Sequence, residues 1–160
     1  MANLADLTSS ELLRLHGAVA DELRARGVVR SANNPVGDLA EYLFCKAFGW
    51  ELAPKSAKAA DAIFDGKLYQ IKGRRLTKHN GSRQLGAMRG LSDGGFDYLA
   101  AVLFNTDYSV LRAAIIPHAS ALSGAKFIEH TNSWKFILRD AVWICSGTED
   151  VTNELRAVDY

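Results

Sequence analysis

Apolar residues in the first third of the chain recur with helical spacing. In two stretches, residues 8–27 and 36–48, apolar side chains return every three or four positions, which is typical of amphipathic helices. Thr8 and Glu11 have the spacing of a capping box at the start of the first stretch. Gly27 is a natural end for it. The pattern therefore predicts two successive helices separated by a short turn.

From residue 50 onward, the pattern changes to short apolar runs rich in aromatic and β-branched residues. The runs on either side of Asp65-Gly66 predict a β-hairpin, because this dipeptide tolerates the positive φ values of tight turns. Later runs predict further strands and two short helices. The predicted strands are 50–52, 61–65, 67–73, 96–104, 110–116 and 134–138, and the later helices are 117–124 and 150–158.

The main elements follow the order α-α-β-β-β-β-α-β-α. This order predicts an α/β fold with a mixed β-sheet flanked by helices. A chain of 160 residues with 48% hydrophobic residues is suited to one domain, residues 1–160. Within it, we expect the N-terminal helix, about residues 8–27, to pack on a core formed by residues 35–160.

Composition excludes little else. The formal net charge is +1, so global charge neither favours nor excludes a polyanionic partner. No apolar run is long enough for a membrane span, and the N-terminus does not resemble a secretory signal, so we expect no membrane partner and a cytoplasmic location. Cys45 and Cys145 lie far apart among apolar neighbours and are predicted to be free, buried thiols.

The hairpin carries the most informative polar residues. Asp61 opens its first strand, and Gln70 and Lys72 lie two positions apart on its second strand. Alternate residues of a strand face the same side, so Gln70 and Lys72 should share a face while Ile71 points into the core. The tight turn folds Asp61 back towards Gln70. The result is a carboxylate, a carboxamide and an ammonium in one cluster, and hard divalent ions such as Mg²⁺ prefer oxygen ligands of this kind.

These residues resemble the signature of the PD-(D/E)XK nuclease superfamily, of which this chain would be a QxK variant. The signature is an aspartate on one strand, followed on the next by an acidic residue, any residue and a lysine. Here it reads Ala60-Asp61 and then Gln70-Ile71-Lys72. The resemblance implies a restriction-endonuclease-like core and Mg²⁺-dependent hydrolysis of nucleic-acid phosphodiesters, with Mn²⁺ as a substitute ion.

The same resemblance implies a role for each matching residue. Asp61 would be the central metal ligand, Gln70 the second ligand and Lys72 the catalytic lysine. Many members add a glutamate from the preceding helix, and Glu41 is placed for that role. Two positions depart from the pattern: Ala60 replaces a common proline, and Gln70 lowers the negative charge of the site by one.

A basic segment follows the motif directly. Between Gly66 and Ser92 there are seven basic residues and no acidic residue. We interpret this segment as a surface that follows a phosphate backbone, although a charge run is also compatible with a plain solvated face. The candidate contacts after the motif are Arg74, Arg75, Lys78, Arg83 and Arg89.

Two further features are weaker. The loop before Asp61 could place Lys55, Ser56 and Lys58 near the scissile phosphate. Asp38, one helical turn before Glu41, is compatible with a second carboxylate of the site or with a first-turn residue favoured by the helix dipole.

The sequence therefore favours a small Mg²⁺-dependent DNA endonuclease of the restriction or repair type, acting on double-stranded DNA as a homodimer. Gln70 keeps open an alternative, a catalytically inactive nuclease-like protein that binds nucleic acid or serves as a subunit of a defence or repair complex. A purely structural interpretation also exists, in which Asp61 starts a turn and Gln70 and Lys72 lie on a solvated strand face.

Overall fold

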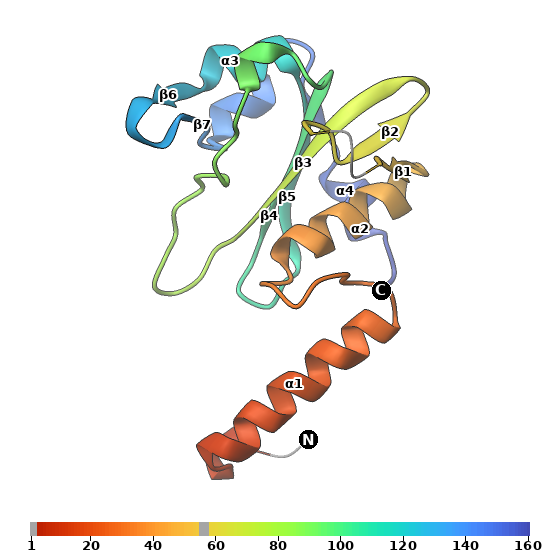
Figure 1. Cartoon of the computed structure of the whole chain (residues 1–160), viewed down its shortest axis with the longest axis vertical. Coiled ribbons are helices and arrows are strands. Elements are labelled where there is room, and N and C mark those ends of the chain that lie inside the picture. Colours follow the sequence, from red (N-terminus) through yellow and green to blue (C-terminus); the bar gives the residue numbers. More distant parts are fainter. Residues whose placement is uncertain (1–2, 55–57) are drawn as a thin grey trace.

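The computed structural model describes residues 3–54 and 58–160 and has mixed α/β architecture (Figure 1). Six strands form one mixed sheet in the order β1-β2-β3-β4-β5-β8, and β6 and β7 form a separate two-stranded sheet. The helices are α1 (Ser9–Ala25), α2 (Val36–Phe48), α3 (His118–Gly124) and α4 (Thr152–Arg156). The strands are β1 (Glu51–Leu52), β2 (Ala62–Phe64), β3 (Lys67–Arg75), β4 (Tyr98–Phe104), β5 (Val110–Pro117), β6 (Lys126–Ile128), β7 (Ser133–Lys135) and β8 (Glu149–Asp150).

The first two helices follow the sequence prediction closely. Thr8 caps α1 in a capping box: its hydroxyl accepts a hydrogen bond from the backbone N–H of Glu11 at 3.3 Å, and the Glu11 carboxylate accepts one from the backbone N–H of Thr8 at 2.8 Å. Gly27 follows α1 with φ of +72°, and Gly49 ends α2 with φ of +67°. Both glycines adopt the left-handed conformation that commonly ends helices.

Helices α2 and α4 cover one face of the main sheet. Leu39, Leu43 and Phe44 of α2 are buried in a core that includes alternate residues of β4 and Leu155 of α4. Helix α2 lies unusually close to β3 at Gly73, where an added Cβ atom would be 3.0 Å from the Cβ atom of Ala40. The absent side chain of Gly73 thus allows the helix to approach the sheet and fixes the position of α2 over β3.

The opposite face carries a second core. It is covered by α3, by β7 and its flanks, and by the connection between β3 and β4. Strands β3 and β4 are parallel, so the chain must cross from one end of the sheet to the other between them. Leu85, Met88 and Leu91 of this connection are buried against the sheet. The basic segment is therefore a crossover anchored by apolar residues.

Several predictions need correction. Five strands, not four, precede α3, and neither β6 nor β8 was predicted. The late strand is β7, in the small sheet, and the terminal helix begins at Thr152 because Glu149 and Asp150 pair with β5. Cys45 is half-buried and Cys145 is exposed, so the prediction of two buried thiols was wrong, although both are free. None of the helices in the described ranges is long and apolar enough to cross a membrane.

Helix α1 differs from the rest of the chain in its packing. It extends away from the sheet in Figure 1, and none of its residues is buried. Leu23, near its C-terminal end, is half-buried and packs against the core beneath α2.

Candidate metal and nucleic-acid site

The hairpin of β2 and β3 places Asp61 opposite Gln70. Asp65 and Gly66 form its turn with φ of 48° and 72°, as the dipeptide predicted. Ala62 pairs with Tyr69, and the backbone N–H of Asp61 donates to the Tyr69 carbonyl at 2.7 Å. Asp61 is thus the residue that immediately precedes β2, and its backbone is still held against β3.

The Asp61 carboxylate continues the pairing that the β2 backbone stops making. Its Oδ2 atom accepts a hydrogen bond from the backbone N–H of Ile71 at 2.7 Å and another from Gln70 Nε2 at 2.8 Å. The carboxylate therefore lies in the sheet edge, at the point where β2 leaves β3. An acidic group in this position can be approached from both faces of the sheet.

Gln70 and Lys72 share one face of β3, as predicted. They pair with Leu99 and Ala101 of β4, whose side chains belong to the second core, whereas Ile71 is buried in the core beneath α2. Lys72 is half-buried, and its ammonium has no hydrogen bond or ion pair with any of the described residues. It follows Gln70 along the strand by roughly 7 Å, the rise of two residues.

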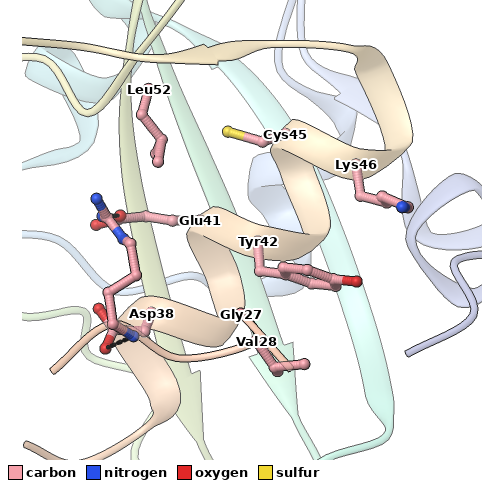
Figure 2. Close-up of a pocket in the computed structure, with 9 residues that line it drawn as sticks. Gly27, Val28, Asp38, Glu41, Tyr42, Cys45, Lys46 and Leu52 are labelled. Carbon is pink, nitrogen blue, oxygen red and sulfur yellow. Dashed lines mark hydrogen bonds and ion pairs between the residues drawn. The ribbon is translucent and has the colours of Figure 1, made fainter. Parts of the chain in front are cut away.

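Glu41 approaches this cluster from α2. Its side chain is 20% exposed and forms an ion pair with Arg30. Burial raises the pKa of Glu41, Arg30 opposes that shift, and the negative charges of Asp61 and Asp38 add to it. The influence of Asp61 on the Glu41 pKa indicates that the two carboxylates belong to one electrostatic cluster. Figure 2 shows Glu41 projecting from the same side of α2 as Asp38 and Cys45.

Asp38 fixes the loop before α2. Its Oδ2 atom accepts hydrogen bonds from the backbone N–H groups of Arg30 and Ser31, at 2.9 and 2.8 Å, and from the Ser31 hydroxyl at 2.9 Å. Burial works to raise the pKa of Asp38, but these hydrogen bonds and the charge of Arg30 outweigh it, so the pKa is lowered. Asp38 therefore serves the loop and holds the backbone of Arg30 beside Glu41.

Arg30 is the residue of this cluster that the sequence analysis missed. It lies in the turn after α1, outside any periodic pattern, and its contact with Glu41 spans eleven positions. No local signal distinguishes it from other exposed arginines. Its position depends on the hydrogen bonds that Asp38 makes to the loop.

Three of the predicted nucleic-acid contacts have partners within the protein. Arg74 donates to the Ser82 carbonyl at 3.0 Å, and Arg83 forms an ion pair with Asp140 at 2.7 Å. Arg75 donates to the Thr106 carbonyl at 2.9 Å and lies over the Tyr108 ring. The remaining described candidates are exposed, and Lys55 and Ser56 lie outside the described residues. These exposed candidates are Lys58, Lys78 and Arg89.

A cavity of about 280 Å³ adjoins Glu41 (Figure 2). Its walls come from α2, the loop before it and Leu52 of β1. Burial, together with the Glu41 charge, raises the pKa of Cys45 in this cavity to about 11. The thiol is therefore protonated at neutral pH and is a poor nucleophile.

The donor set fits a divalent ion in its chemistry. In the ranges 3–54 and 58–160, no three His, Cys, Asp or Glu side chains form a group that could hold a metal. The candidate set instead combines the carboxylates of Asp61 and Glu41 with the carboxamide of Gln70. Mg²⁺ is commonly bound by one or two carboxylates and keeps several waters, so this set is sufficient. The raised pKa of Glu41 shows an excess of negative charge that a cation would relieve.

Comparison with the models of known protein families gave no match, and neither did comparison with curated proteins. The functional argument therefore rests on the residues of this chain and their arrangement.

Proposed function

We propose that the protein is a Mg²⁺-dependent phosphodiesterase that cleaves DNA, with Mn²⁺ as a substitute ion, in restriction or repair. The observation that carries this proposal is the position of Asp61. Its carboxylate lies at the separation of β2 and β3, bonded to Gln70 and Ile71. The Glu41 carboxylate is near enough for Asp61 to affect its pKa. A restriction-endonuclease-like core would present the ligands of a phosphodiesterase at this place.

Each residue then has a role that follows from its chemistry. Asp61 and Glu41 supply the charge that holds the ion. A carboxamide has one donor end and one acceptor end, and Gln70 uses its donor end on Asp61, which leaves Oε1 as the end for an ion. When bound, Mg²⁺ polarises the phosphate and lowers the pKa of a coordinated water.

Lys72 completes the site. Its ammonium, on the same face of β3 as Gln70, is positioned to stabilise negative charge on a phosphate or to orient the attacking water. The exposed residues Lys58, Lys78 and Arg89 would contact the nucleic-acid backbone, with Lys55 and Ser56 in the loop before Asp61. Such contacts carry no base specificity and make affinity fall as salt rises.

The test is cleavage of supercoiled plasmid in Mg²⁺, Mn²⁺ or EDTA. Asp61→Ala, Asp61→Asn and Lys72→Ala should each lower the rate by roughly a hundredfold or more while the circular dichroism spectrum stays unchanged. Asp61→Asn is included because it keeps an oxygen for the Ile71 N–H. Lys67→Ala is the matched control, since Lys67 is exposed at the start of the same strand. Cleavage that persists in Asp61→Asn and Lys72→Ala would refute the proposal.

Gln70 supports a second candidate, a protein that binds nucleic acid without cutting it. The residue is uncharged and donates its amide to the carboxylate that would be the central ligand. In this case the plasmid stays intact in every ion, while gel retention is strong and sensitive to salt. Gln70→Glu separates the two candidates: in a working enzyme it alters the metal dependence of an existing rate, and in a binding protein it leaves cleavage absent.

A further inference from the structure

Helix α1 carries an apolar stripe that the rest of the chain leaves uncovered. Leu12, Leu15, Val19 and Leu23 follow one another at intervals of three or four residues and so lie on one side of the helix. Leu12, Leu15 and Val19 are 38%, 43% and 51% exposed. Isolated exposed leucines are ordinary, but a contiguous stripe is typical of an interaction surface.

The stripe leads into a cavity where α1 meets the sheet domain. This cavity has a volume of about 330 Å³, and Val19 and Leu23 form part of its wall. Much of the remaining lining is apolar or aromatic, including Leu39, Tyr108 and Tyr160. The apolar surface of α1 is therefore continuous with that of the cavity, and Figure 1 shows α1 extending away from the sheet beyond this junction.

The stripe is complementary to itself when two copies run antiparallel. A two-fold axis near Gly17 places Leu12 opposite Leu23 of the second copy and Leu15 opposite its Val19. Nothing lies within 4 Å of a Cβ atom built on Gly17, so the midpoint of the helix is open for close approach. The N-terminal end of each α1 would then reach the junction cavity of the other copy.

The charges of α1 favour the same direction. Its N-terminal end carries Glu11, and its C-terminal end carries Arg24 and the following Arg26. An antiparallel pair brings the acidic end of one helix to the basic end of the other and also opposes the helix dipoles. A parallel pair would place like charges together. The charge pattern therefore selects a second copy of this chain, in antiparallel orientation, as the occupant.

We propose that α1 is a dimerisation helix that pairs antiparallel with α1 of a second copy along Leu12, Leu15, Val19 and Leu23. The pairing covers the stripe, and the leucines at the N-terminal end of each helix enter the partner's junction cavity. This interface is isologous, so it closes at two copies. It is independent of the phosphodiesterase site, and its test does not involve cleavage.

The mass of the full-length chain in solution, measured by light scattering after size exclusion, tests the interface. The wild-type chain should have twice its mass of 17.5 kDa. Leu15→Glu with Val19→Glu should give a monomer with an unchanged circular dichroism spectrum. Ser10→Glu, which adds a charge on the opposite side of α1, should remain a dimer. A wild-type monomer at about 100 µM, well above the Kd of specific pairs, or a dimer that survives the double substitution, would overturn the proposal.

Cross-linking tests the direction of the pair in a Cys145→Ser background. An equimolar mixture of Leu12→Cys and Leu23→Cys should form a disulfide-linked dimer on a non-reducing gel, because these positions face each other. Either variant alone should stay uncross-linked, since equivalent positions would be roughly 16 Å apart at 1.5 Å per residue. Cross-linking of each variant with itself would show a parallel pair and contradict the proposed geometry.

Discussion

Helices α1 and α2 follow each other in the chain and have similar amphipathic patterns, but their apolar faces have different environments. Helix α2 buries Leu39, Leu43 and Phe44 against the sheet, whereas α1 buries none of its residues. The periodicity of apolar residues thus specifies that a helix has a face to be covered. It does not specify whether the cover comes from the same chain.

The comparison extends to the polar flanks. On α2 the flank next to the buried face carries Asp38 and Glu41, whose positions are fixed because the helix is fixed. A residue of a candidate catalytic site needs such a rigid support. Helix α1 has no comparable support within one chain, which suits an element that pairs with a partner.

The largest expected difference between the two helices is in stability. Phe44→Ala should lower the free energy of unfolding by about 3–5 kcal/mol, because Phe44 is fully buried and its removal leaves a cavity. Leu13→Ala in α1 should change it by less than about 0.5 kcal/mol, because Leu13 is 72% exposed. Urea unfolding at low protein concentration measures both. Equal losses in the two variants would mean that α1 is packed as tightly as α2.

A smaller effect is expected at the contact between α2 and β3. Gly73→Ala should cost about 1–3 kcal/mol, because the new methyl group would be 3.0 Å from the Ala40 Cβ atom and from the Val36 carbonyl oxygen. Gly81→Ala is the control in the following loop, where an added Cβ atom meets nothing within 4 Å. The same urea titration compares them, and an unperturbed Gly73→Ala would show that α2 can move away from the sheet freely.

The smallest effects concern the pH dependence contributed by two carboxylates of α2. The pKa of Asp38 is lowered from 3.8 in the folded protein, so its stabilising contribution is present above that value and is lost as pH falls through the folded pKa. The pKa of Glu41 is raised from 4.5, so its contribution is present below that value and is lost as pH rises through the folded pKa.

Asp38→Asn should therefore be destabilising near neutral pH and less so in acid, whereas Glu41→Gln should gain stability relative to the wild type as pH rises. Thermal unfolding across pH 3–7 measures both differences. The same sign for both variants would contradict the opposite pKa shifts.

The sequence was a good guide to features determined by neighbouring residues. The capping box of Thr8, the ends of α2 and the turn at Asp65 and Gly66 depend on a few adjacent positions, and all were predicted correctly. Gln70 and Lys72 were placed on one face by strand alternation alone. Strand β8 was not foreseen, because two residues have no period and pair with β5 across a long stretch of chain. Arg30 was missed for a similar reason, since its contact with Glu41 depends on how a loop folds.

The parallel pairing of β3 and β4 has a consequence for the order of folding events. The β2–β3 hairpin closes through two residues, and β4 and β5 are joined by a turn at residues 105–109. Joining β3 to β4 requires closure of the crossover at residues 76–97, with an entropic cost that grows with the logarithm of its length and is on the order of 3 kcal/mol. We therefore expect the two hairpins to form early and their docking to limit the folding rate. Asp61 and Gln70 belong to one hairpin, so their contact can exist before the sheet is complete.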